Sequence, residues 1–361
     1  MAPHAGNYLD NIEPATGLVY SHIPDSDAQD IELAVAAAKA ASAAWANMHY
    51  EKRAEIIEKI AAGIEARMEE FVLAESLDNG KPQWLARQVD IPRAVHNFRF
   101  FATGIQHFSS ESHYMEGLGV NYTTRRPIGV VACIAPWNLP LYLFSWKIAP
   151  ALVAGNCVVA KPTEVTPYTA YLLSEVCIAA GLPKGVLNIV HGLGSKIGDV
   201  ISLHPDIKAI SFTGGTSTGK RIASLAAPMF KKLSLELGGK SPAVITADAN
   251  LRVAARRLAS PKFSNCGQMC IAPDYILVPS ELKDKLIKEL IKAIQSFYGA
   301  DAAASEHYGK IINDKQWLRI TSYLSEGEIV YGGKSNREKL FIEPTIMTGI
   351  HEDAKIMQDE I

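Results

Sequence analysis

The stretch AISFTGGTSTGKR, residues 209–221, decides the fold, because a short apolar run leads into glycines and then into a helix-like segment. Gly214, Gly219 and Lys220 match the start of the triphosphate-binding loop GxxxxGK[ST]. Arg221 stands where that loop has its hydroxyl residue. A strand, a glycine turn and a helix start point backbone N–H groups at an anion, and a diphosphate fits here better than ATP with magnesium. The alternative is a tight turn that only requires glycine.

The same alternation extends over the middle of the chain. Five short apolar runs, separated by segments of helix length, read IGVVACIA, NCVVA, VLNIV, AISF and KKLSLEL. Alternating strands and helices form βαβ units, so the pattern predicts a doubly wound α/β domain with a parallel sheet. An alanine-rich stretch over residues 27–72 predicts helices before the sheet, with Ser26 and Gln29 as the capping box of the first one.

Single residues mark further helix ends. Thr166 followed by Pro167 predicts a capped helix start, and Gly155 and Gly181 stand where two helices should stop. A boundary near Leu237 separates this region from a second, incomplete α/β region, in which YILVP predicts a strand, residues 280–298 a helix, and YGGK with FIEPTIM a turn and a strand. The polar, β-favouring residues from about 107 to 126 predict a projecting hairpin.

Composition excludes several classes of partner. With 48% hydrophobic and 20% charged residues in 361, the chain has the profile of an ordinary globular protein. Its net charge is −2 and its basic residues form no block, which argues against nucleic acid and anionic membranes and favours a small ligand. The first residues lack a signal peptide pattern, so we expect a cytoplasmic protein. Five cysteines argue against a disulfide framework, and no spacing predicts a metal site.

Cys270 is the candidate nucleophile. It lies in FSNCGQMC, after a glycine and among polar residues rather than in an apolar run. A free thiol has a pKa of about 8.5, so an activated cysteine needs backbone amides or positive charge nearby. The alternative for Cys270 is a small buried hydrophobic residue, and that alternative is the stronger one for Cys266.

Two more candidate catalytic residues lie at or just after the ends of predicted strands. Glu236 ends the apolar run in SLELGGK, where burial would raise the pKa of its carboxyl group and make it a general base. The alternative is a buried acid held by hydrogen bonds. Asn138 lies between two prolines in APWNLP, where its amide can donate to an oxyanion or simply serve a turn.

Lys161 and Glu164, in AKPTE, follow yet another predicted strand. A second glycine set, GLGSKIG from Gly192 to Gly198, has the spacing GxGxxxG and is a weak signal alone. Ligands of doubly wound sheets bind at the carboxyl ends of the strands. Four such ends with polar residues therefore predict one ligand crevice.

Together these motifs resemble the aldehyde dehydrogenase family. PWN, KPTE, FTGGT, LELGGKSP and FSNCGQMC occur in the order and at the spacings of that family, over essentially the whole chain. The resemblance implies an NAD(P)-binding domain over residues 1–236, with an oligomerising hairpin at about 107–126, and a catalytic domain over residues 237–361. It also implies that the glycine turn contacts a dinucleotide pyrophosphate, so that Arg221 is no defect.

The resemblance implies a mechanism as well. Cys270 attacks the aldehyde carbon, and the Asn138 amide and the Cys270 backbone N–H hold the oxyanion. Hydride passes to the nicotinamide, and Glu236 activates the water that hydrolyses the thioester to a carboxylic acid. The expected cofactor is NAD, with NADP as the second choice, and the partner is a second copy in a homodimer or homotetramer. The implied cofactor contacts are Trp137, Lys161, Glu164, Gly194, Gly198, Thr213, Gly214, Gly215, Gly219, Leu237 and Glu360.

Two features depart from the family pattern. Up to about residue 250, WNLPLYLFSWKIAPAL is similar to the muconic semialdehyde branch, whereas NCGQMCIAPDYILV through IMQDEI is similar to the class 3 branch for aliphatic and aromatic aldehydes. The chain also ends at Ile361, where the family continues with FGP. We therefore expect an incomplete catalytic domain, weak NAD binding, little aldehyde oxidation and poor solubility. The alternative function is a fragment or non-catalytic relative that only binds the dinucleotide.

Overall fold

The computed structural model describes residues 2–361, which divide into two compact units. The first unit comprises the chain up to Asn11, Ser21–Ala74 and Arg87–Glu236. The second unit comprises Ile12–Tyr20, Glu75–Ala86 and Leu237–Ile361. Two short early segments thus belong with the later part of the chain, which no sequence pattern predicts.

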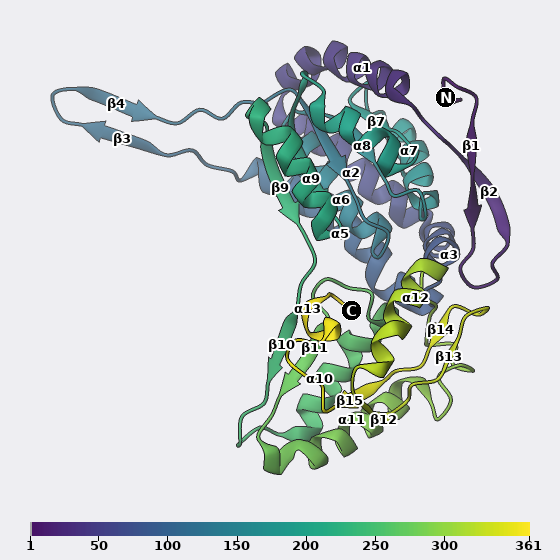
Figure 1. The fold of residues 1–361 in the computed structure, drawn as a ribbon. Helices are drawn as coiled ribbons and strands as arrows, with labels where there is room; N and C mark the ends of the chain where they lie inside the picture. The colour runs from purple at the N-terminus through teal and green to yellow at the C-terminus, as the bar shows by residue number, and fades with distance from the viewer. Residues whose placement is uncertain (1) are drawn as a thin grey trace. The chain divides into compact units, whose positions relative to one another are not determined.

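A parallel five-stranded sheet forms the centre of the first unit (Figure 1). Its strands are β5 (Val130–Ile134), β6 (Cys157–Lys161), β7 (Leu187–Ile189), β8 (Ile207–Thr213) and β9 (Lys232–Glu236), in the order β7-β6-β5-β8-β9. Every residue of β5 and β6 is buried, as expected of central strands with both faces covered. The predicted doubly wound sheet is confirmed.

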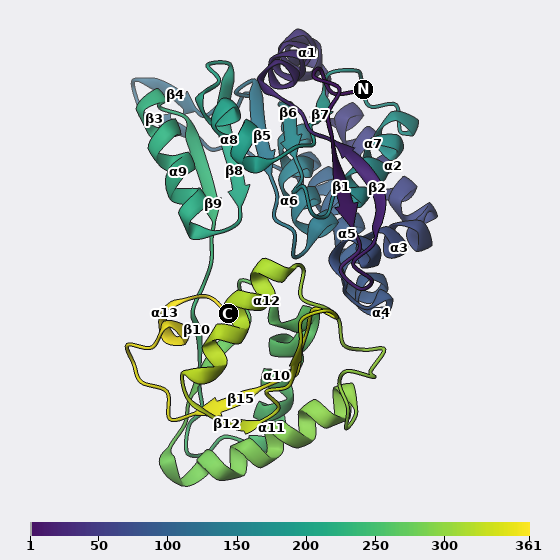
Figure 2. The ribbon, with the colours of Figure 1, turned by 45° about the vertical axis from the view of Figure 1, so that its right-hand side comes forward.

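Helices cover both faces of this sheet (Figure 2). One face packs against α1 (Ala28–Asn47), α8 (Gly194–Leu203) and α9 (Thr216–Ala226). The other face packs against α6 (Pro140–Val153) and α7 (Tyr168–Ala179), with α2 (Tyr50–Ala66) and α5 (Ile91–Gln106) outside them. The elements between α2 and α5 are α3 (Met68–Asn79), α4 (Gln83–Leu85) and a π-helical turn, Ala86–Asp90.

The first helix starts one residue later than its sequence predicts. The N-cap of α1 is Asp27, whose carboxylate accepts hydrogen bonds from the N–H groups of Gln29 (2.8 Å) and Asp30 (3.3 Å). The Asp30 carboxylate accepts in return from the Asp27 N–H (3.0 Å), which completes a capping box. The predicted box of Ser26 and Gln29 is wrong, because two aspartates make the same exchange one position further on.

The expected cap of α7 is also wrong. Pro167 holds the N-cap position, no side chain caps the helix, and Thr166 Oγ1 is buried without a hydrogen-bond partner among the described residues. Gly155 (φ 89°) and Gly181 (φ 79°) follow the ends of α6 and α7 in left-handed conformations. Those two predicted helix ends are confirmed.

The predicted hairpin is present. It consists of β3 (Ser112–Met115) and β4 (Gly119–Tyr122), which pair antiparallel and project from the first unit (Figure 1). All eight strand residues are exposed. A second hairpin near the N-terminus pairs β1 (Tyr8–Ile12) with β2 (Val19–Pro24).

The second unit has its own small core. Its parallel strands β10 (Ser241–Val244) and β11 (Pro273–Leu277) pack with α10 (Leu251–Phe263) and α11 (Lys283–Tyr298). Two antiparallel pairs join β12 (Glu328–Tyr331) to β15 (Ile346–Thr348) and β13 (Ser335–Asn336) to β14 (Phe341–Ile342). The remaining helices are α12 (Asp314–Ser322) and α13 (Lys355–Gln358). The predicted strand at YILVP and the predicted helix up to Tyr298 are confirmed, whereas α12 was not predicted.

No helix of residues 2–361 has both the length and the apolar character to cross a bilayer.

Candidate active site

The sheet of the first unit has a topological switch point between β5 and β8. From β5 the chain proceeds outward to β6 and β7, and then it returns to β8 on the other side and proceeds to β9. Ligands of such sheets bind outside the carboxyl ends of the strands at this point. Trp137 and Asn138 follow β5 closely, and Thr213 ends β8, so three of the predicted site residues lie there.

The glycine turn after β8 leads into α9. Gly215 is the N-cap of this helix and no side chain caps its first N–H groups. A Cβ atom at Gly215 would meet nothing within 4 Å, whereas one at Gly214 would lie 2.5 Å from Cζ of Phe212. Gly219 is buried in the second turn of the helix. The turn therefore combines a close contact at Gly214 with open space at Gly215 and a helix start that no side chain of the described residues caps, which fits a phosphate group.

A second uncapped helix start lies after β7. Leu193 is the N-cap of α8 and offers no side-chain cap, and a Cβ atom at Gly198 would meet nothing within 4 Å. A Cβ atom at Gly194 would lie 3.9 Å from the ammonium nitrogen of Lys161. That ammonium is buried and donates to the carbonyl of Pro162 (3.0 Å) and to the Glu164 carboxylate (3.0 Å). The predicted residues of β6 and α8 thus lie together.

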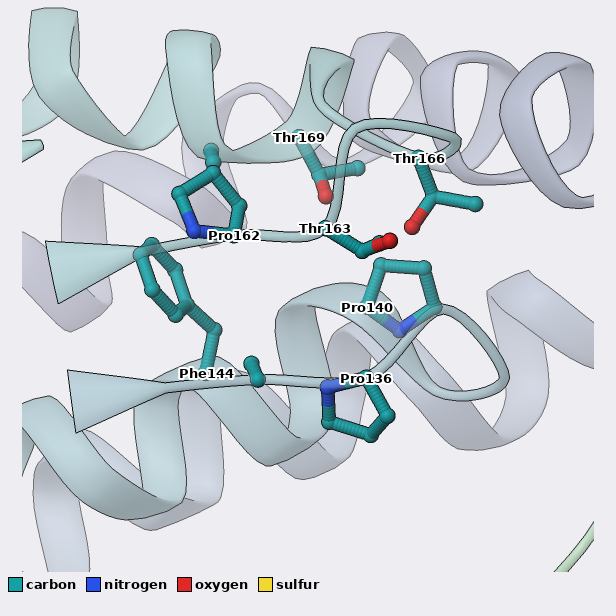
Figure 3. A pocket seen from close by; sticks show the side chains of 9 residues that line it. Pro136, Pro140, Phe144, Pro162, Thr163, Thr166 and Thr169 are labelled. Carbon is teal, nitrogen blue, oxygen red and sulfur yellow. The ribbon is translucent and has the colours of Figure 1, made fainter. Parts of the chain in front are cut away.

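Asn138 is held in a defined orientation. Its Oδ1 accepts a hydrogen bond from the backbone N–H of Leu139 (3.0 Å), so the NH2 end of the amide is the donor. Pro136 and Pro140 bracket it and line an apolar crevice between the ends of β5 and β6 (Figure 3). The other lining residues are Ala135, Phe144, Pro162, Thr163, Thr166, Thr169 and Ala170. The prolines on either side of Asn138 therefore pack against side chains at the ends of β5 and β6.

Glu236 is exposed, so its predicted burial is wrong, both as the reason for a general base and in the alternative of a buried, hydrogen-bonded acid. It ends β9, an edge strand whose residues alternate between exposed and half-buried, and its carbonyl accepts the Gly214 N–H (3.1 Å). Its side chain lies on the same exposed face as those of Lys232 and Ser234, because side chains alternate between the two faces of a strand. Thr213, opposite Glu236 in the sheet, has a buried Oγ1 without a hydrogen-bond partner among the described residues.

The sequence motifs missed Lys147 of α6. This lysine is buried, and its ammonium lies 3.4 Å from Ser211 Oγ. Burial lowers the pKa of Lys147, while the negative charge of Glu236 opposes that shift. The signal for Lys147 is its place in an apolar helix, SWKIAPAL, where a cation needs a partner.

In the second unit, Cys270 lies in a turn after α10 and is half-buried. Three consecutive residues before it, Asn265, Cys266 and Gly267, have left-handed backbone angles (φ 48°, 55° and 80°). Gln268 holds this loop: its Nε2 donates to the carbonyls of Asn265 (3.0 Å) and Lys310 (3.1 Å). Its Oε1 accepts the N–H of Ile312 (3.0 Å). The loop is therefore fixed from several sides.

Cys266 differs from Cys270 in its surroundings. It packs against the core of the second unit together with Tyr298 and Tyr308. Burial raises the pKa of its thiol to about 12, so it stays protonated at neutral pH. Cys266 thus behaves as a buried hydrophobic residue.

Leu237 and Glu360 are the remaining predicted residues. Leu237 is half-buried at the start of the long segment of the second unit. The carbonyl of Glu360 accepts a hydrogen bond from Nη1 of Arg319 (2.6 Å). Burial, followed by the charge of Asp274, raises the pKa of the Glu360 carboxyl group.

The predicted residues thus fall into two groups. Those of the second unit are Cys270, Leu237 and Glu360. Those at the carboxyl edge of the first-unit sheet, or on the helices that start there, are Asn138, Glu236, Trp137, Lys161, Glu164, Gly194, Gly198, Thr213, Gly214, Gly215 and Gly219.

Comparison with known proteins defines the class of this protein. The profile of the aldehyde dehydrogenase family matches residues 1–361. A crystal structure of indole-3-acetaldehyde dehydrogenase with NAD+ superposes with a TM-score of 0.94 at 34% identity, covering 100% of this chain and 75% of that one. The chain belongs to the aldehyde dehydrogenase family, and NAD-dependent oxidation of an aldehyde is its activity.

Within that family, the chain is similar to muconic semialdehyde dehydrogenases. It is 41% identical to the 2-aminomuconic semialdehyde dehydrogenase of Bos taurus, over 98% of this chain and 76% of the relative. It is 38% identical to the 2-hydroxymuconic semialdehyde dehydrogenase of Pseudomonas sp. (strain CF600), over 99% of this chain and 77% of the relative. The predicted likeness to the muconic branch is confirmed, and the class 3 character after residue 250 stays a prediction. Because the chain belongs to this family, the glycine turn after β8 is not a triphosphate-binding loop.

Proposed function

We propose that the aldehyde is oxidised on Cys270. The thiolate sulfur adds to the aldehyde carbon, and the oxyanion of the resulting thiohemiacetal accepts hydrogen bonds from the Asn138 NH2 and the Cys270 backbone N–H. The oriented amide of Asn138 carries this part of the proposal, since its Oδ1 is engaged by Leu139 and its NH2 is the donor. When bound, the nicotinamide supplies a hydride acceptor.

Glu236 is the proposed base of the second half-reaction. It takes a proton from the water that attacks the thioester, and the carboxylic acid product leaves Cys270 as its thiolate is released. An exposed carboxylate suits this role, because water reaches it without opening the fold. The charge of Glu236 opposes the fall in the pKa of Lys147 that burial causes.

The residues of the first unit fit a dinucleotide. Two uncapped helix starts, at Gly194 and after Gly215, offer backbone N–H groups to a diphosphate. Lys161 and Glu164 would hold the adenosine ribose, with Glu164 disfavouring a 2′-phosphate, so NAD is the proposed cofactor in preference to NADP. The buried hydroxyl of Thr213, which has no hydrogen-bond partner within residues 2–361, would contact the bound cofactor. Trp137 would flank the cofactor, and Leu237 and Glu360 complete the proposed contacts.

The proposed substrate is a semialdehyde of the muconic type, oxidised in the cytoplasm. Its support is the group of relatives whose names specify 2-aminomuconic and 2-hydroxymuconic semialdehydes. A panel of a muconic semialdehyde, aliphatic aldehydes and aromatic aldehydes tests the choice, with NADH absorbance as the measurement. Higher kcat/KM for an unbranched aliphatic aldehyde would contradict it.

The test of the mechanism separates the two cysteines and the two half-reactions. Cys270→Ala should abolish NADH formation, whereas Cys266→Ala, four residues away, should retain it because that thiol is buried and protonated. Glu236→Gln should retain a first burst of NADH and lose steady turnover, because the thioester persists. An undiminished steady rate in Cys270→Ala contradicts the proposal, and so does loss of the burst in Glu236→Gln.

A further inference from the structure

His191 lies beside Lys161 at the carboxyl edge of the sheet. Strands β6 and β7 are paired through Ala160 and Ile189, and the Val190 N–H donates to the Ala160 carbonyl (2.8 Å). Lys161 follows Ala160 directly, and His191 lies two residues after Ile189, beyond Val190. Two basic side chains thus leave the ends of neighbouring strands.

The imidazole of His191 is enclosed and incompletely bonded. Its Nδ1 is shielded from solvent and has no hydrogen-bond partner among residues 2–361, although a minor part of the residue is exposed. Burial, and then the charge of Lys161, lower the pKa of His191 to about 4. The ring is therefore neutral at physiological pH, and one of its nitrogens is a hydrogen-bond acceptor.

The neighbouring ammonium has donor capacity left. Lys161 uses two N–H groups in its bonds to Pro162 and Glu164 within the described chain, and an ammonium has three. A buried donor and a buried acceptor at adjacent strand ends match a ligand hydroxyl, which accepts from one and donates to the other. A buried polar atom left unbonded costs free energy, so a ligand that bonds it gains affinity.

A phosphate ester in the same place does not match. Its second pKa is about 6, so at neutral pH it carries mostly acceptor oxygens and no proton to donate. Those oxygens would face the lone pair of Nδ1, although Lys161 would attract them. A hydroxyl is thus favoured over a phosphate by His191, independently of the charge of Glu164.

We propose that His191 determines cofactor specificity, its Nδ1 accepting a hydrogen bond from the 2′-hydroxyl of the adenosine ribose and thereby favouring NAD over NADP. This inference rests on the proposed dinucleotide site of the first unit. His191 would contact the cofactor away from the reacting carbon, so its loss should show first in cofactor affinity.

The experiment measures binding of NAD, of NAD with a 2′-deoxyadenosine, and of NADP by calorimetry to the whole chain. His191→Leu and His191→Phe remove the ring nitrogens, and His191→Asn keeps an acceptor near the position of Nδ1. The apolar variants should bind NAD about 3- to 10-fold more weakly, as expected for one hydrogen bond, and His191→Asn should stay within about twofold. Thermal unfolding of each variant shows that it is folded.

The deoxy analogue identifies the contact. His191→Leu should bind 2′-deoxy-NAD as well as the unchanged protein does, and its ratio of NADP to NAD affinity should rise. Equal weakening for NAD and the deoxy analogue would overturn the proposal and leave a structural role. An unchanged NAD affinity in both apolar variants would also overturn it. If the unchanged protein bound none of the dinucleotides, the proposed cofactor site itself would be wrong. That result is distinguishable from a failure of the His191 proposal alone.

Discussion

Cys266 and Cys270 show how much a single residue depends on its surroundings. Both occur in one motif, FSNCGQMC, and both residues are half-buried. The Cys266 thiol nevertheless packs with Tyr298 and Tyr308, where desolvation raises its pKa, whereas Cys270 lies in a turn. The sequence ranked Cys270 first because of its polar neighbours. Burial could not be read from the motif, since Tyr298 and Tyr308 come from parts of the chain 28 or more residues further on.

Asn138 carries the first residue-level prediction. Asn138→Ala should lower kcat by about 10²- to 10³-fold if the amide donates to the oxyanion. Asn138→Asp is the matched variant, because its carboxylate can still accept from the Leu139 N–H while the NH2 donor is gone. We expect both variants to be impaired to a similar degree. Full activity of Asn138→Asp would reduce Asn138 to a turn residue.

His191 predicts a pH dependence of stability. Its pKa falls from 6.5 to about 4 on folding, so between these pH values the unfolded chain binds more protons than the folded one. The neutral ring contributes its full share to the free energy of unfolding above pH 6.5. That share, up to about 3 kcal/mol, is lost as the pH falls toward 4. Urea unfolding at pH 7 and pH 5 should show a larger loss for the unchanged protein than for His191→Asn. Equal losses would contradict the assignment.

At the scale of elements, strands were predicted better than helix starts. Each apolar run of the first region became a strand. The two central strands, β5 and β6, are continuously apolar because both of their faces are buried. The start of α1 was displaced by one residue because Asp27 and Asp30 cap it better than Ser26 does. Local patterns fix an element's type, whereas competition between neighbouring caps decides its first residue.

Glycines at element ends give a paired prediction. Gly185 (φ 82°) and Gly181 (φ 79°) are both left-handed, but only at Gly185 would a Cβ atom meet backbone, at 2.5 Å from the carbonyl oxygen of Ala37. Gly181→Ala should cost about 1 kcal/mol of unfolding free energy, for strain alone. Gly185→Ala should cost about 3 kcal/mol or more, because α1 must also shift. Urea midpoints measure the difference, and equal costs would refute the close approach.

For the whole molecule, the sequence missed how early segments join the second unit. The Lys310 N–H donates to the Gly80 carbonyl (3.0 Å), and Lys81 forms a buried ion pair with Glu75 (3.3 Å). No local period indicates that residues 75–86 pack with residues more than two hundred positions later. The predicted boundary near Leu237 came from a change in local pattern, and long-range packing leaves no such mark.

The exposed hairpin supports a prediction about assembly. Tyr114, Val120 and Tyr122 share one face of the β3–β4 ribbon and are 77%, 61% and 68% exposed. A two-stranded ribbon is marginal alone, so this face should pack against a second copy. Val120→Lys should therefore shift the expected homo-oligomer toward monomer in light scattering. Asn121→Lys, on the opposite face, is the control, and equal dissociation by both would contradict a one-sided interface.

The division of the chain into interleaved units affects its synthesis. The path changes unit after Asn11, Tyr20, Ala74, Ala86 and Glu236. On a ribosome, Ile12–Tyr20 and Glu75–Ala86 emerge long before the residues from Leu237 onward with which they pack. Until those residues are synthesised, the side chains of the two segments have no packing partners, although the first unit can already fold. Chaperones commonly protect such partly folded nascent chains. Expression of residues 237–361 alone would leave that unit without two of its own pieces.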